Sequence, residues 1–169
     1  ASGVQAELHV PVIPFARADF RLRQDAVLLF KHCGFELDDQ GAPRDLIFWD
    51  ELGSAPNAAA CDAATEASPP LSLVLTDHNR VTPSVRERLG QRVVSIIDHH
   101  QDEGVHTDTC PAAHRTIDTA AGSACSLVAA ELQSLLGREI APSAAPPKEL
   151  CALLLGTIAA DCRGFDPAQ

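Results

Sequence analysis

The sequence contains no methionine, no tyrosine, a single tryptophan and only two lysines, and none of its cysteines form a C-x-x-C pair. With six phenylalanines as the other aromatic residues, the core has to consist mostly of alanine, valine, leucine and isoleucine. The six cysteines follow no secretory signal, so we expect reduced thiols and a cytoplasmic protein. The longest apolar stretch, residues 150–160, is far shorter than the ~20 residues that span a bilayer, which argues against a membrane protein.

Net charge restricts the classes of partner. The 169 residues carry a formal net charge of −10 at pH 7. Because affinity for nucleic acid and anionic membranes comes mainly from Lys and Arg, non-specific binding to either is not expected. An acidic protein that handles phosphates needs metal ions to neutralise them. The chain begins almost directly with a strand pattern and without an initiator methionine, so we expect a fragment of a longer protein.

Strand patterns alternate with helix patterns, which predicts an α/β fold with a parallel β-sheet flanked by helices. We expect strands over residues 8–13, 45–49, 71–76 and 92–97, and helices over residues 22–33, 82–90, 123–136 and 147–160. Gly34, Gly90 and Gly137 are predicted to end the first three helices. Residues 53–70 lack an apolar period and predict a loop insertion, and residues 101–121 are expected to be irregular.

Two neighbouring strand patterns end in acidic and imidazole side chains. The first runs into Asp77, and the second runs into Asp98, His99 and His100. Ligands of parallel sheets bind outside the carboxyl ends of the strands, so these side chains are expected to meet. The predicted metal ligands are Asp77, His99 and Asp161, the last of which ends an apolar helix. Carboxylate and imidazole ligands favour Mn²⁺, Mg²⁺ or Co²⁺ over structural zinc.

Further residues are candidates for binding the phosphates of a substrate. Gly122 and Ser123 precede a helix, and the free N–H groups at a helix N-terminus attract anions. A simple serine cap without a ligand explains the same residues equally well. Arg80 and Arg115 are candidates for contacting distal phosphates, although a solvated surface position is the commoner role of such side chains.

Four ordered motifs give the chain a family resemblance. They are D-H-N at 77–79, I-I-D-H-H at 96–100, G-S-A-C-S-L-V at 122–128 and L-L-L-G-T-I-A-A-D-C at 153–162. In this order they resemble the DHH phosphoesterases, and most of all the branch of short-chain exopolyphosphatases, prune proteins and family II inorganic pyrophosphatases. The resemblance covers nearly all of residues 1–169 apart from the expected insertion, and it implies a DHH-type N-terminal domain. The family's first motif, an Asp-x-Asp, and its C-terminal substrate domain are missing, so we expect the domain to be incomplete.

The resemblance implies a role for each matching residue. Asp77 matches a carboxylate that bridges two metal ions, and His99 and Asp161 match further metal ligands. His100 matches the imidazole that faces the phosphate, and Asp98 matches a carboxylate that orients an imidazole. The implied activity is metal-dependent hydrolysis of a phosphoanhydride, in short polyphosphate or pyrophosphate, by a water activated between two Mn²⁺, Mg²⁺ or Co²⁺ ions. We expect the fragment alone to be inactive.

Three other functions stay open. Other DHH proteins are phosphodiesterases that act on short oligonucleotides or cyclic dinucleotides. A prune-like regulator would bind proteins with little or no catalysis, but the intact DHH triplet counts against it. A small zinc module could use Cys110 and His114, but these residues lack a matching second pair.

Overall fold

The structure is a computed structural model that describes residues 10–51, 72–139 and 146–165. It divides into two compact units, Ala1–Pro69 and Pro70–Gln169. Parallel strands and helices in both units confirm the predicted α/β class, with the strands in two small sheets. The insertion predicted at residues 53–70 lies outside the described residues. No helix in the described ranges combines the length and the apolar character needed to cross a membrane.

Within its described residues, 10–51, the first unit contains a two-stranded parallel sheet beside one α-helix. Its elements are β1 (Val12–Ile13), η1 (Arg17–Leu22), α1 (Gln24–His32), β2 (Ile47–Phe48) and η2 (Trp49–Glu51). Phe20, Ala42 and Phe48 are buried together, and the Phe20 and Phe48 rings meet edge to face with centroids 5.7 Å apart. Aromatic packing thus supplies the core of a unit whose strands are too short to do so.

Arg17 links the polar groups of this unit. Its guanidinium donates hydrogen bonds to Asp38 over 2.9 Å, to the Leu46 carbonyl over 2.6 Å and to Glu51. Its Cζ atom lies 4.4 Å from the centroid of the Phe48 ring. The rigid five-donor fork of arginine can bind several acceptors at once, so one side chain joins η1 to β2 and the loop before it.

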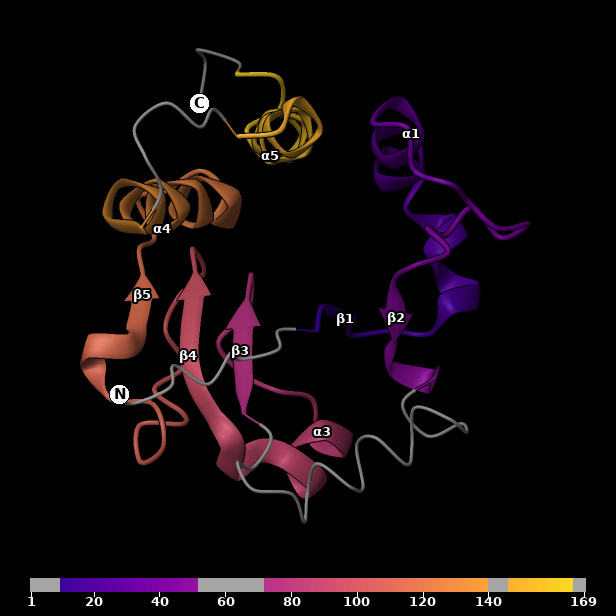
Figure 1. Ribbon diagram of the computed structural model, residues 1–169. Helices are drawn as coiled ribbons and strands as arrows, with labels where there is room; N and C mark the ends of the chain where they lie inside the picture. The colour runs from indigo at the N-terminus through magenta and orange to yellow at the C-terminus, as the bar shows by residue number, and fades with distance from the viewer. Residues whose placement is uncertain (1–9, 52–71, 140–145, 166–169) are drawn as a thin grey trace, which may run out of the picture. The chain divides into compact units, whose positions relative to one another are not determined.

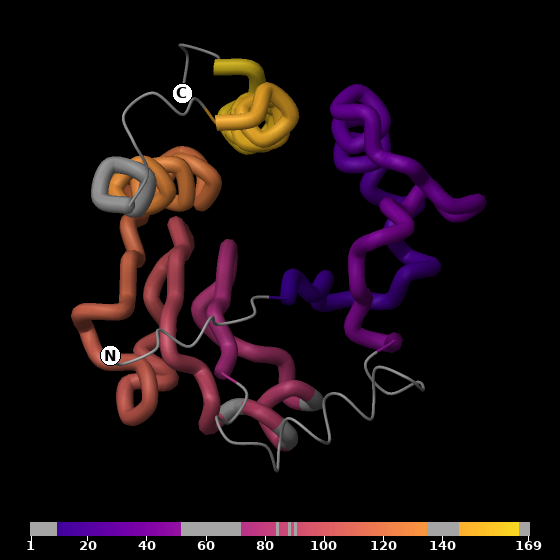
Figure 2. Tube along the Cα trace, in the orientation of Figure 1, coloured from indigo at the N-terminus to yellow at the C-terminus, as the bar shows by residue number. Residues whose placement is uncertain are grey.

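The second unit is built on a parallel sheet with the strand order β3-β4-β5 (Figures 1 and 2). Its elements are β3 (Leu73–Thr76), α3 (Pro83–Leu89), η3 (Gly90–Arg92), β4 (Val93–Asp98), η4 (Ala112–His114), β5 (Arg115–Ile117), α4 (Ala124–Glu139) and α5 (Lys148–Asp161). A parallel pair needs a crossover connection, and α3 provides it between β3 and β4. The carboxyl ends of all three strands therefore lie along one edge of the sheet.

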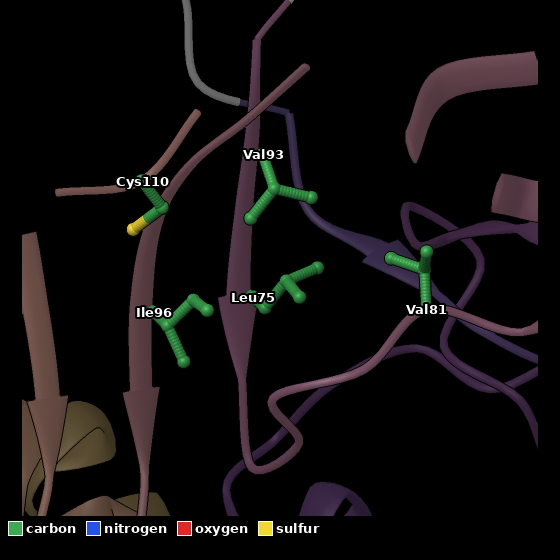
Figure 3. Packing of buried hydrophobic residues seen from close by; sticks show 5 residues of the cluster. All are labelled: Leu75, Val81, Val93, Ile96 and Cys110. Atoms are coloured by element: carbon green, nitrogen blue, oxygen red, sulfur yellow. The ribbon is translucent and has the colours of Figure 1, made fainter. Parts of the chain in front are cut away.

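The central strand β4 carries the core of the second unit. Val93 and Ile96 are completely buried and pack with Leu75, Val81 and Cys110 (Figure 3). A strand that is buried on both faces reads as a continuous apolar run, which explains why the sequence locates β4 well. Asp98, the last residue of β4, is completely buried as well.

Two predictions about secondary structure are wrong. Residues 101–121 are not irregular throughout, because they contain η4 and β5, which pairs with the end of β4. A strand of three residues is too short to show an alternating pattern in the sequence. Gly137 does not end its helix, since α4 continues to Glu139. An interior glycine costs a helix about 1 kcal/mol relative to alanine, which the neighbouring residues can offset.

Candidate functional site

Three side chains meet beyond the carboxyl ends of β3 and β4. Asp77, His99 and His100 offer ligand atoms that all lie within 4.8 Å of one another. The sheet register explains this convergence, because Thr76 pairs with Ile97 and both strands then run out at the same edge. The structure therefore brings together two of the three predicted metal ligands, Asp77 and His99, and adds His100, which the sequence assigned to the phosphate.

Asp77 has a backbone conformation that few residues adopt. Its φ is +66°, in the left-handed region, although it is not a glycine. Its N–H donates to the Ile97 carbonyl over 2.9 Å, so the contact between the two strands extends one residue beyond β3 before the chain turns. Its carboxylate is 62% exposed. Strained residues of this kind persist where the surroundings hold them and are concentrated at functional sites.

Hydrogen bonding determines which nitrogen of His99 faces Asp77. Nδ1 lies 3.1 Å from the Ala121 carbonyl, which can only accept, so Nδ1 carries the hydrogen. Nε2 then has a lone pair in the neutral ring, and it lies 3.3 Å from Asp77 Oδ1. In its neutral form, His99 presents a nitrogen lone pair to the space beside the Asp77 carboxylate, as two ligands of one cation do.

Asp98 is a completely buried carboxylate behind the two histidines. Its Oδ1 accepts hydrogen bonds from His100 Nδ1 over 2.8 Å and from the backbone N–H groups of His99 and His100 over 2.8 and 3.2 Å. His100 Nδ1 is thereby committed to Asp98, which leaves Nε2 as the nitrogen that can meet a ligand. Asp98 therefore holds the ring of His100 by its Nδ1 nitrogen.

The same contacts shift the pKa values of Asp98 and His100. Burial raises the pKa of Asp98, but hydrogen bonds from His100, Asn79 and the backbone outweigh burial and hold this pKa below its ordinary value. The hydrogen bond to Asp98 raises the pKa of His100, and the charges of Asp98, Asp77 and Asp161 raise it further against the opposing effect of burial. The pair therefore favours an ionised carboxylate beside a readily protonated imidazole.

Asn79 completes the surroundings of Asp98, and no role was predicted for it from the sequence. It is only 4% exposed, and its Nδ2 donates to Asp98 Oδ2 over 2.6 Å and to the Gln101 carbonyl over 3.0 Å. Its Oδ1 accepts the backbone N–H of Glu103 over 3.0 Å. The signal available in the sequence was an asparagine two residues after the metal-ligand candidate Asp77.

Asp161 lies outside the three-residue group and is bound by Ser123. Ser123 is completely buried, and its Oγ lies 2.5 Å from Asp161 Oδ2. The same Oγ accepts the Cys125 N–H over 3.2 Å, which is the geometry of a helix N-cap at the start of α4. Among the described residues, Asp161 therefore acts on the site through its charge, which contributes to the raised pKa of His100.

The two arginines predicted to bind phosphate differ in their surroundings. Arg80 is 54% exposed and forms a surface ion pair with Glu103 over 2.5 Å. Arg115 is 9% exposed, and its fork is engaged with Asp102 over 2.6 Å and with the Val105 carbonyl over 2.9 Å. Arg115 thus anchors the loop that follows His100, whereas Arg80 is the more accessible of the two.

The zinc alternative receives no support from the geometry of its two residues. The Cys110 thiol is buried and lies 3.4 Å from the backbone carbonyl of His114, and the His114 side chain is exposed. Within the described ranges, neither residue belongs to a group that could hold a metal ion.

No protein-family model matches the chain. A search of curated proteins also finds no match.

Proposed function

We propose that this protein is a metal-dependent phosphoanhydride hydrolase of the exopolyphosphatase or pyrophosphatase type. The observation that carries the proposal is the convergence of Asp77, His99 and His100 at the edge of a parallel sheet, with Asp98 buried behind them. Ligand sites of open α/β sheets lie at this edge. The resemblance of the four sequence motifs to DHH phosphoesterases supports the same activity.

The donor set fits Mn²⁺, Mg²⁺ or Co²⁺. Asp77 and His99 supply an exposed carboxylate and an imidazole nitrogen with a free lone pair, and the Ala121 carbonyl fixes the His99 ring. These residues would hold one ion, and Asp161 is the carboxylate that we assign to the second. Such ions supply positive charge to the phosphate oxygens and make water a better nucleophile.

The remaining residues act on the substrate. Asp98 holds His100 by Nδ1, so His100 Nε2 can donate a hydrogen bond to a phosphate oxygen when the ring is protonated. Arg80 is accessible enough to exchange Glu103 for a distal phosphate. An acidic protein gains little affinity for phosphate from its own net charge, so this function depends on the ions.

The test is phosphate release from pyrophosphate and tripolyphosphate by the full-length protein that contains this chain, with Mn²⁺ and with excess chelator. We expect turnover with the ion and none with the chelator. His99→Ala should weaken Mn²⁺ binding, measured by calorimetry, by at least about tenfold. His78→Ala is the matched control, because the His78 ring nitrogen lies 2.9 Å from the Thr76 carbonyl rather than in the group.

Two outcomes would overturn the proposal. Chelator-resistant turnover would exclude a metal-dependent reaction, and equal losses of Mn²⁺ affinity in the His78 and His99 variants would exclude the assigned ligand. The same assay with a phosphodiester, bis(p-nitrophenyl) phosphate, tests the alternative function. Faster hydrolysis of this substrate than of tripolyphosphate would indicate the phosphodiesterase function instead.

A further inference from the structure

Asn79 is a buried polar side chain next to the site that forms three hydrogen bonds. It is 4% exposed, and it uses both amide hydrogens and its carbonyl oxygen. The partners of Nδ2 are a carboxylate and a carbonyl, which only accept, and the partner of Oδ1 is an N–H group, which only donates. The orientation of the amide is therefore determined by its neighbours.

The two oxygens of Asp98 have separate sets of donors. Oδ1 accepts from the His99 and His100 backbone and from His100 Nδ1, whereas the side chain of Asn79 approaches Oδ2. If the Asn79 side chain is removed, Oδ2 of the buried Asp98 carboxylate loses the hydrogen bond that Asn79 Nδ2 donates. A carboxylate in that position gains from rotating or from admitting water, and either change moves the oxygen that holds His100.

We infer that Asn79 is the positioning residue of this site, which fixes the Asp98 carboxylate and through it the ring of His100. Its bonds to Gln101 and Glu103 also tie the loop after His100 to the turn after β3. The expected effect on catalysis rests on the proposed function, whereas the effect on the His100 ring does not.

The first measurement is the tautomer of His100 by ¹⁵N NMR, in protein without metal or substrate. In the unaltered protein we expect the Nδ1–H form, because Asp98 accepts this hydrogen. Asn79→Ala should shift the neutral ring toward the Nε2–H form, which a solvated imidazole favours. Gln101→Ala is the matched control, since it changes an exposed side chain and keeps the carbonyl that Asn79 contacts.

The second measurement is kinetic. With tripolyphosphate and Mn²⁺, Asn79→Ala should lower kcat by about tenfold and change KM by less than about threefold, as expected for a residue that supports a catalytic group from behind. Gln101→Ala should keep both constants within about twofold. If the unaltered protein has no hydrolase activity, the proposed function fails, and the tautomer measurement still decides the role of Asn79.

An unchanged His100 tautomer in folded Asn79→Ala would overturn the inference. If this variant does not fold, the unaltered protein provides the decisive measurement. Its Asn79 Nδ2 hydrogens should exchange with solvent at least about tenfold more slowly than those of an exposed asparagine amide, because both are hydrogen-bonded and buried. Exchange at the rate of an exposed amide would also overturn it.

Discussion

Ser123 and Asp161, 38 positions apart in the sequence, are joined by a hydrogen bond of 2.5 Å between Ser123 Oγ and Asp161 Oδ2. This bond links the N-cap residue of α4 to the last residue of α5. Close approach of the two helix ends is possible because Gly122 has no side chain, since a Cβ atom there would lie 2.6 Å from Cys162 Sγ.

Gly122→Ala should therefore destabilise the second unit by about 1–3 kcal/mol, the usual cost of overpacking. Cys162→Ala removes the sulfur atom that the new methyl group would meet, so the double variant should recover most of the loss. Thermal unfolding of the four proteins measures this coupling. Additive effects of the two substitutions would contradict the close contact.

His100→Ala should separate metal binding from turnover. Because we assign His100 Nε2 to the phosphate and not to the ion, we expect Mn²⁺ affinity to stay within about threefold of the unaltered protein. Loss of a group that contacts phosphate should lower kcat by about 100-fold, within the range of general acid–base effects. Calorimetry and phosphate release give the two quantities, and a loss of Mn²⁺ affinity as large as in His99→Ala would show that His100 is a ligand.

Arg115→Gln should loosen the loop after His100. The substitution removes the charged contacts to Asp102 and Val105, so backbone amides of residues 102–105 should exchange with deuterium at least about tenfold faster. Arg80→Gln is the control, because its ion pair with Glu103 lies on the surface. Equal exchange in both variants would show that Arg115 is not the anchor of this loop.

Arg17→Ala should lower the free energy of unfolding of the first unit by about 2 kcal/mol, because it leaves Asp38 and Glu51 without their shared charged donor. Trp49 is the only tryptophan of the chain and lies in this unit, so its fluorescence in urea follows the transition. Asp25→Asn, which changes an exposed pair with Arg23, should stay within about 0.5 kcal/mol of the unaltered protein.

The stability of the first unit should also depend on pH below about 4. The hydrogen bond from Arg17 lowers the pKa of Glu51. Burial raises the pKa of Asp38, but hydrogen bonds from the Ala42 N–H and from Arg17 outweigh burial and lower this pKa overall. Both carboxyl groups have lower pKa values in the folded chain than in the unfolded chain. Their contribution to stability is therefore complete at a pH above the unfolded pKa values, and it is lost as the pH falls through the folded pKa values. Urea unfolding by tryptophan fluorescence from pH 6 to about pH 3 measures the slope, which Arg17→Ala should reduce.

The α/β class and the location of the candidate site could be predicted because both depend on local patterns. Two apolar runs that each end in acidic or imidazole residues predict neighbouring strands, and the parallel arrangement brings Asp77 to His99. The short strand β5 could not be predicted in this way, because its three residues form a strand only by pairing with β4.

The sequence by itself therefore determined which chemical groups lie at the strand ends, and the tertiary structure decided what each of them faces. That the His99 Nε2 nitrogen points to Asp77, that Arg115 is occupied by Asp102, and that His100 rather than Asp161 joins the group all depend on contacts between distant segments. The role of Asn79 depends on three such contacts. Hydrogen bonds that span 19, 22 and 24 residues leave no periodic trace in the sequence, because only the packed chain brings donor and acceptor together.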